Sequence, residues 1–152
     1  MMEGVAVHPL KHIVVPKGDI YHALKSTDEG YAGFGEAYFS QIEQGAAKGW
    51  KRHNRMTLNL VVPVGAVKFV IYDDREGSPT RGQFEEITLS PESCYQRLTV
   101  APVINIFIKL QCLKFIVYCL QLHPACFRRI MRFRYDIHQH GYALPLSIKG
   151  HP

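Results

Sequence analysis

The sequence predicts an all-β protein, built as a sandwich or barrel of short antiparallel strands. Runs of β-branched and aromatic residues recur at roughly ten-residue intervals, as is usual in such folds. Turns rich in Gly, Pro, Asp and Ser separate these runs. No segment before residue 100 has the apolar period of a helix. These three observations favour an all-β class over any fold that contains helices.

The predicted elements follow one another as strands joined by turns. The first half contains a strand–turn–strand over residues 9–24, a Gly-rich loop over 26–35, a strand over 36–43 and a turn over 44–53. The second half contains strands over 56–65 and 66–74, a turn over 75–82, and strands over 83–90 and 95–102.

Composition predicts a single globular domain. The chain has 152 residues, 47% of them hydrophobic and 20% charged, so it is long enough for one domain with its own core. Its four cysteines form no C-x-x-C pair, which fits a reduced protein better than a disulfide framework or a zinc site. The N-terminus has no basic region followed by an apolar one, so no secretory signal is expected. The sequence therefore predicts a cytoplasmic protein.

The charge distribution changes sharply near Pro102. Residues 1–100 carry 11 Lys/Arg and 12 Asp/Glu, whereas residues 101–152 carry 7 and 1. We therefore expect a β-barrel domain over residues 1–102, incomplete at its end, and an atypical basic tail over residues 103–152. One interpretation of the tail is a segment that contacts nucleic acid or a membrane. The other is a segment translated in a shifted reading frame.

An apolar run over residues 103–122, "VINIFIKLQCLKFIVYCLQL", has about the length needed to span a bilayer. Lys109 and Lys114 lie inside the run, where each would be costly at the centre of a membrane. The alternation of Ile104 and Ile106 with polar or aromatic neighbours favours a strand. We predict neither a membrane nor a nucleic acid as a partner.

His53 is the first candidate for a catalytic residue. An imidazole takes up a proton near neutral pH, so it suits general base catalysis. Removing a proton beside a carbonyl also requires a group that holds the enolate oxygen, and cations suit both that oxygen and a diphosphate. The residues near His53 that offer such groups are Lys48, Lys51, Arg52, Arg55 and Asn59. The alternative is a histidine with a purely structural role at the start of a strand.

The spacing around His53 resembles the first motif of the cupins, which are small jelly-roll barrels. Gly45 and Gly65 occupy the two ends of that motif, and His53 takes the place of its second histidine. Lys51 replaces the first histidine and Leu58 replaces the glutamate, so two of the usual metal ligands are lost. The resemblance implies a cupin barrel without a metal site.

A more specific resemblance covers residues 8–102. The segments "FGEAYFS", "KGWKRHNRMTLNLVVPVG" and "DDREGSPTRG" are similar to the dTDP-4-dehydrorhamnose 3,5-epimerase family of RmlC-like cupins, in particular its epimerase-like branch from cell-surface polysaccharide gene clusters. The resemblance implies that His53 is the base that removes a proton beside the keto group of the sugar. Asn59 is the nearest match to the family lysine that helps to hold the enolate. Asp73 matches an aspartate in the acidic turn of the family.

The resemblance also implies the ligands and the assembly. The expected substrate is a nucleotide-diphosphate 4-keto sugar, and no metal or redox cofactor is needed, because the keto group itself acidifies the neighbouring protons. A homodimer is expected from the family. The residues expected to contact the substrate are Glu36, Tyr38, Lys51, Arg52 and Arg75.

The resemblance ends at "RLTVAP", where the family continues with Gly and an aromatic turn and later supplies a tyrosine acid. This is also the place of the charge break, and the coincidence favours the shifted reading frame. Three activities remain open: a 3,5-epimerase of deoxysugar and polysaccharide biosynthesis, a sugar 3,4-ketoisomerase of the same fold, and a catalytically inactive sugar-nucleotide-binding cupin.

Overall fold

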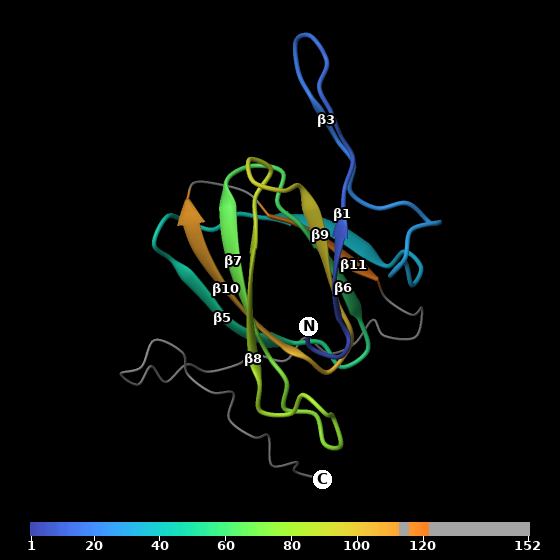
Figure 1. Cartoon of the computed structure of the whole chain (residues 1–152), viewed down its shortest axis with the longest axis vertical. Coiled ribbons are helices and arrows are strands. Elements are labelled where there is room, and N and C mark those ends of the chain that lie inside the picture. The colour runs from blue at the N-terminus through green and yellow to red at the C-terminus, as the bar shows by residue number, and fades with distance from the viewer. Residues whose placement is uncertain (113–115, 122–152) are drawn as a thin grey trace.

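The chain folds into two β-sheets that lie face to face, with a hairpin that projects from one end (Figure 1). The structure is a computed structural model, and it describes residues 1–112 and 116–121. Within these ranges every regular element is a strand, which confirms the predicted all-β class, and no helix is present that could cross a bilayer. The strands are β1 (Val5–Pro9), β2 (His12–Ile13), β3 (Ile20–Tyr21), β4 (Glu36–Ser40), β5 (Ala47–Arg52), β6 (Thr57–Val61), β7 (Ala66–Tyr72), β8 (Phe84–Leu89), β9 (Gln96–Val100), β10 (Asn105–Cys112) and β11 (Ile116–Gln121).

The chain passes repeatedly from one sheet to the other. The larger sheet has the strand order β1-β9-β6-β11-β4, and the smaller one has the order β5-β10-β7-β8. Consecutive strands such as β4 and β5, or β6 and β7, therefore belong to different sheets. All the pairings are antiparallel. This exchange of strands between two packed sheets is the architecture of a jelly-roll barrel.

The hydrophobic core fills the space between the two sheets. On β6 the inward positions are Leu58 and Leu60, and on β7 they are Val67, Phe69 and Ile71. These five side chains are at most 3% exposed. Successive side chains of a strand point to opposite faces, so each strand contributes every second residue to the core. The strands predicted over residues 56–65 and 66–74 are confirmed.

Strands β10 and β11 follow the point where the sequence predicts the barrel to end. β10 pairs with β5 and β7, and β11 pairs with β4 and β6, so both lie inside their sheets. The strand predicted from the alternation of Ile104 and Ile106 is confirmed, and both side chains are 2% exposed in the core. The division of the chain at residue 102 remains a prediction, and residues 122–152 of the predicted tail lie outside the described part.

Two strands differ from the sequence prediction. β1 begins at Val5, before the first predicted strand, and pairs along its whole length with β9. The turn predicted over residues 44–53 is wrong for residues 47–52, which form β5. β5 is held by pairing with β10, which lies far along the chain. Local propensity does not report such a contact, because strand formation depends strongly on tertiary context.

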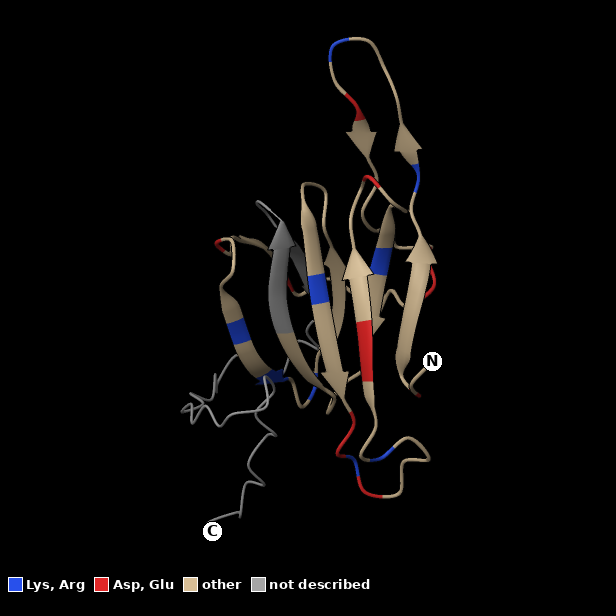
Figure 2. Ribbon diagram, turned by 60° about the vertical axis from the view of Figure 1, so that its left-hand side comes forward, with Lys and Arg blue, Asp and Glu red and all other residues tan. Residues whose placement is uncertain are grey.

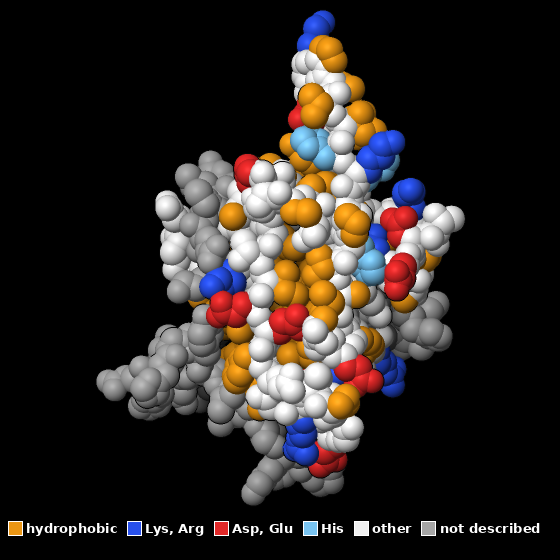
Figure 3. Space-filling model, viewed as in Figure 1, with side chains coloured by type: hydrophobic (Ala, Val, Ile, Leu, Met, Phe, Trp, Pro, Cys, Tyr) orange, Lys and Arg blue, Asp and Glu red, His pale blue; other side chains and the backbone are white. Residues whose placement is uncertain are grey.

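The predicted strand–turn–strand near the N-terminus is present as the β2–β3 hairpin, which extends beyond both sheets (Figures 1 and 3). The His12 ring stacks on Tyr21 with 4.4 Å between ring centroids, and its Nε2 lies 2.7 Å from Asp19 Oδ2. Val14 and Ile20 are 75% and 50% exposed. Contacts within the hairpin therefore contribute to its shape, while these two apolar side chains lie largely outside any core.

The outer face of the larger sheet carries a buried polar contact with a loop. Asn59 is fully buried, and its Nδ2 donates to the carbonyl oxygen of Gly30 at 3.2 Å. Its Oδ1 accepts a hydrogen bond from Thr99 Oγ1 at 2.8 Å. The amide is thereby satisfied at both ends, as burial of a polar group requires. The loop around Gly30 is fastened to the sheet by this contact.

Replacing Gly30 with alanine tests how closely this loop is packed. Gly30 has a φ of 79°, and an added Cβ would lie 3.0 Å from Thr99 Cγ2 and Oγ1. Gly33, with a φ of 93° and nothing within 4 Å of an added Cβ, is a matched control. A left-handed backbone costs an alanine about 1–2 kcal/mol, so both variants should lose that much. We expect Gly30→Ala to lose more than Gly33→Ala in urea unfolding, and equal losses would contradict the close packing.

Candidate active site

The pairing of β5 with β10 shows which β5 side chains face the barrel interior. Lys51 lies opposite Ile106, which belongs to the hydrophobic core. Side chains of directly opposed residues share one face of a sheet, so Lys51 faces the interior. Arg52 lies opposite Asn105, one position further along, and faces the other way.

His53 follows β5 directly and, by alternation, shares the inward face of Lys51. Its carbonyl oxygen accepts a hydrogen bond from the backbone N–H of Val103 at 2.7 Å, which fastens the end of β5 to the segment before β10. Burial, and secondly the charge of Lys51, lower the pKa of His53 from its ordinary value of 6.5. A partly buried imidazole that is neutral at pH 7 is suited to accept a proton.

A tyrosine on the neighbouring sheet faces the same interior. Tyr38 on β4 packs against the core, and Glu36 shares its face by alternation. Burial, and secondly the charge of Glu36, raise the pKa of Tyr38 from its ordinary value of 10. The phenol therefore keeps its proton at neutral pH and can donate a hydrogen bond.

The strands that carry these residues are tied together. β4 and β5 are edge strands of different sheets. Lys48 Nζ on β5 donates to Ser40 Oγ on β4 at 2.9 Å and to the carbonyl oxygen of Gln41 at 2.6 Å. The structure thus directs His53 and Lys51 from one strand, and Tyr38 from the other, toward the interior along one seam between the sheets.

Arg52 belongs to a separate group on the outer side of β5. Its Nη1 donates to Asp74 Oδ2 at 3.1 Å, and Asn105 Nδ2 donates to Asp74 Oδ1 at 2.9 Å. Arg52 and Asp74 are 31% and 28% exposed at their side chains. This group joins β5, β10 and the end of β7, so the structure gives Arg52 a contact between strands.

Asp73 organises the turn between β7 and β8. The carboxylate of this fully buried residue accepts hydrogen bonds from Arg75 Nε at 2.9 Å and Arg75 Nη2 at 2.8 Å, and from Ser78 Oγ and Thr80 Oγ1, each at 2.6 Å. The Arg75 guanidinium, helped by the two hydroxyls, holds the pKa of this carboxyl well below its usual range. Arg75 Nη2 also donates to the Glu3 carbonyl oxygen at 2.6 Å. Asp73 and Arg75 therefore fasten the N-terminus to this turn.

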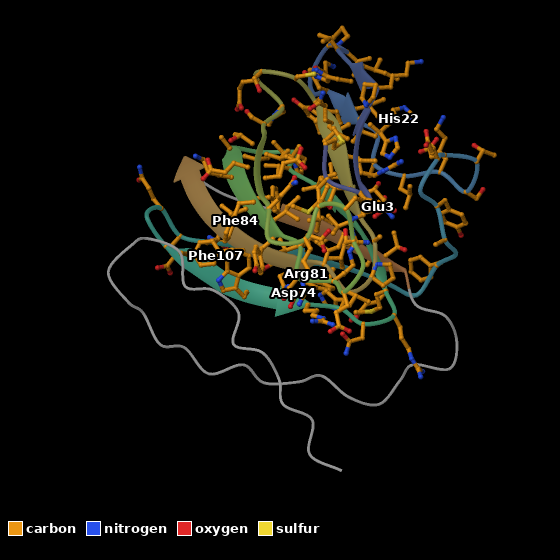
Figure 4. The ribbon with its side chains drawn as sticks, turned by 60° about the horizontal axis from the view of Figure 1, so that its bottom comes forward. Glu3, His22, Asp74, Arg81, Phe84 and Phe107 are labelled. Carbon is orange, nitrogen blue, oxygen red and sulfur yellow. The ribbon has the colours of Figure 1, made fainter. Side chains whose placement is uncertain are left out.

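This turn is rich in charges of both signs (Figure 2). Figure 4 shows Asp74 and Arg81 at this end of the barrel. The contacts of Asp73 and Arg75 are with the turn itself and with the chain near the N-terminus. Both side chains are thus held by contacts within this turn and with the chain near the N-terminus.

Asn59 lies on the opposite face of its sheet from the core. Its neighbours Leu58 and Leu60 occupy the core face of β6, so Asn59 faces outward and its amide is occupied by Gly30 and Thr99. A shift of one residue along a strand moves a side chain to the other face. The position expected to help hold the enolate is thus on the outer side of the sheet.

Two features of this region are predicted by no sequence motif. Asn105 donates a hydrogen bond to Asp74 in the Arg52–Asp74 group, and Ser40 Oγ accepts a hydrogen bond from the Lys48 ammonium. Neither stands in a motif, and only the pairing of distant strands brings them into place. Across residues 1–112 and 116–121, no three His, Cys, Asp or Glu side chains gather as a metal site would require.

Comparisons with known proteins agree with this fold. A dTDP sugar isomerase from Desulfovibrio desulfuricans G20 is 31% identical, with a TM-score of 0.77, and the match covers 82% of each chain. The probable low-salt glycan biosynthesis epimerase Agl13 from Haloferax volcanii is 35% identical over 54 residues. That match covers 35% of each protein, so the chain spans only about a third of this relative. No protein-family model matches the chain.

More distant structures share the fold. The dTDP-6-deoxy-D-glucose-3,5-epimerase RmlC from Legionella pneumophila, solved with dTDP-4-keto-L-rhamnose, is 20% identical with a TM-score of 0.70 and covers 81% of this chain and 70% of its own. The exchange of strands between two packed sheets defines a jelly-roll barrel of the cupin type. Within that class, the chain belongs to the dTDP-4-dehydrorhamnose 3,5-epimerase-like family of RmlC-like cupins.

Proposed function

We propose that the protein is an isomerase that acts on a nucleotide-diphosphate 4-keto sugar, in the biosynthesis of a deoxysugar. The observation that carries this proposal is that His53 and Lys51 lie on the same inward face. Burial, and secondly the charge of Lys51, lower the pKa of His53 below 6.5. One group can accept a proton while the other stabilises negative charge. The similar proteins support the substrate class, because one is a dTDP sugar isomerase and another was solved with a dTDP-4-keto sugar.

The proposed reaction is a proton transfer beside the keto group. His53 takes a proton from C3 or C5 of the sugar, and the electrons of the broken C–H bond move toward the C4 keto oxygen to give an enolate. The Lys51 ammonium, which lies on the same face, stabilises the oxygen as charge develops. A proton from solvent then adds to the other face of the carbon, which gives the epimer and regenerates the ketone, and His53 releases the proton it took to solvent.

The remaining inward groups would position the sugar. Tyr38 keeps its proton at neutral pH, because burial raises its pKa, so it can donate a hydrogen bond to a sugar oxygen. Glu36 shares its face and can accept one from a hydroxyl. For Arg52, contact with the diphosphate would require the ion pair with Asp74 to open. The expected homodimer remains a prediction.

Two other activities use the same fold. A 3,4-ketoisomerase would move the carbonyl along the ring through the same enolate and would differ only in its product. A catalytically inactive sugar-nucleotide-binding cupin is favoured by one observation: the amide of Asn59 is fully occupied by Gly30 and Thr99, so it offers nothing to an enolate.

Deuterium exchange distinguishes these activities. The full-length chain would be incubated with dTDP-4-keto-6-deoxyglucose in D2O and followed by proton NMR. We expect loss of the C3 or C5 proton signal together with a change of configuration at that carbon. A product with its carbonyl at C3 would assign the ketoisomerase. Binding of dTDP without any exchange, in a folded protein, would assign the inactive cupin and contradict the proposal.

A further inference from the structure

Val103 has a backbone conformation that valine rarely adopts. Its φ is 70°, in the left-handed region, and Lys17 is the only other non-glycine residue in the described part of the chain with a positive φ. This conformation is costly for a β-branched residue, because its Cβ lies close to the following carbonyl oxygen. Such a conformation persists only where the surrounding structure fixes it, and residues of this kind gather at functional sites.

The segment around Val103 is fixed on both sides. Ala101 before it donates its N–H to a carbonyl oxygen near the N-terminus at 2.8 Å. Ile104 after it is 2% exposed in the core, and Asn105 begins β10. Pro102 precedes it directly, with a φ that its ring holds at about −65°. A proline followed by a residue with positive φ is the pattern of a type II turn. The chain therefore passes from β9 to β10 through a turn that requires the left-handed conformation at Val103.

This turn brings the N–H of Val103 to the backbone of His53. The N–H donates to the carbonyl oxygen of His53 at 2.7 Å. β5 ends at Arg52, which lies opposite Asn105, so His53 follows directly after the paired part of the strand. The direction of a side chain follows from the backbone that carries it. A hydrogen bond that fixes the carbonyl group of His53 therefore also fixes where its imidazole points.

We propose that Val103 is a positioning residue for His53: its left-handed backbone directs its N–H to the His53 carbonyl oxygen and so holds the imidazole at its partly buried, inward position. The proposal rests on the proposed function of His53 as the base, but the position of the ring can be measured without a substrate. Burial, and secondly the charge of Lys51, lower the pKa of His53 from 6.5. Without the hydrogen bond from Val103 the ring would move toward solvent, and its pKa would rise toward 6.5.

Val103→Pro removes this hydrogen bond without changing a charged side chain. Proline has no N–H, and its φ of about −65° excludes the left-handed conformation. We expect the pKa of His53 to rise toward 6.5, as followed by proton NMR of the imidazole in the full-length chain, with His53→Ala identifying the signal. Exchange of the sugar proton should fall about 10–100-fold in kcat with little change in KM, because the base is displaced and sugar binding is not.

Lys17→Pro is a matched control. Lys17 also follows a proline and has a φ of 78°, but it lies in the turn of the β2–β3 hairpin, which projects from one end of the barrel (Figure 1). Val103 lies toward the β7–β8 turn at the other end, because Asn105 pairs with Tyr72 at the end of β7 (Figure 1). Lys17→Pro makes the same backbone change far from the candidate site. It should leave the pKa of His53 and the exchange rate as in the wild type.

A second pair of variants tests the hydrogen bond directly, including the case in which Val103→Pro does not fold. Val103→Gly and Val103→Ala both keep the N–H and remove the branched side chain, but only alanine keeps the cost of a positive φ. The amide of residue 103 is the donor to His53, so its protection from hydrogen exchange measures this bond. Protection should be about 5–30-fold greater in Val103→Gly than in Val103→Ala.

Three results would overturn the proposal. The first is a folded Val103→Pro variant in which the pKa of His53 or the exchange rate matches the wild type. The second is an equal change in Lys17→Pro, and the third is protection in Val103→Ala that equals or exceeds that in Val103→Gly. If the pKa of His53 rises as expected but the wild type exchanges no sugar proton, the positioning of the ring is supported and the isomerase activity is contradicted.

Discussion

The His53→Ala variant is expected to lose deuterium exchange at the sugar carbon by about 10²–10⁴-fold, the usual contribution of a general base. The substitution removes the proposed acceptor of the proton while leaving Lys51 and Tyr38 in place. Exchange rates measured by NMR at saturating substrate would give the ratio of rate constants. An exchange rate within twofold of the wild type would show that another group removes the proton.

The pH dependence of exchange provides an independent check on His53. The base acts in its neutral form, and its lowered pKa keeps it neutral further below pH 6.5 than an ordinary histidine. Exchange should therefore persist as the pH falls below 6.5 and decline only at the lower pKa of His53. Lys51→Met removes a positive charge that disfavours the imidazolium, so the acidic decline should move to higher pH. If the acidic decline does not move, the charge of Lys51 does not affect the pKa of His53.

The Asp73→Ala variant is expected to lose about 3 kcal/mol of unfolding free energy, the lower end of the cost of removing one partner from a buried ion pair. The change deletes the acceptor of Arg75, Ser78 and Thr80 and leaves the guanidinium without its carboxylate. Asp74→Ala, at a partly exposed pair with Arg52, is the comparison variant; it also removes the acceptor of the buried Asn105 amide and should lose less than Asp73→Ala, about 1–2 kcal/mol. Urea unfolding of both variants at pH 7 measures the difference.

The contribution of Asp73 to the free energy of unfolding should also depend on pH. Its folded-state pKa lies below the ordinary value of 3.8, so the stabilisation is complete above that value and is lost as the pH falls toward the folded-state pKa. The gap in unfolding free energy between wild type and Asp73→Ala should therefore narrow as the pH is lowered below about 3.8. A gap that stays constant between pH 5 and pH 3 would mean that the carboxylate does not titrate in this way.

Local patterns in the sequence predict much of the fold. Alternating apolar residues place Leu58, Leu60 and Phe69 in strands, and all three lie in the core. The same patterns miss β5, because its Gly- and Lys-rich residues become a strand only through pairing with β10. A strand that depends on a partner more than fifty residues away leaves little trace in its own composition.

The candidate site was predictable only in part. The motif around His53 points to that residue and to Lys51, and the structure turns both toward the interior. Asn59 illustrates the limit, because a single step along β6 decides between the core face and the outer face. His8 and Arg97 show a second limit, since they lie opposite each other only through the pairing of β1 with β9.

The position of β10 has a consequence for how the chain is made. Among the described strands, β10 is the sole partner of β5, the strand that leads into His53. During synthesis from the N-terminus, β4 to β9 are complete before β10 exists. β5, which leads into the proposed base His53, therefore remains unpaired until residues about fifty positions later have been made. A chain whose synthesis stops before Asn105 would lack β10, so β5 and the proposed active site at its end would have no strand to pair with.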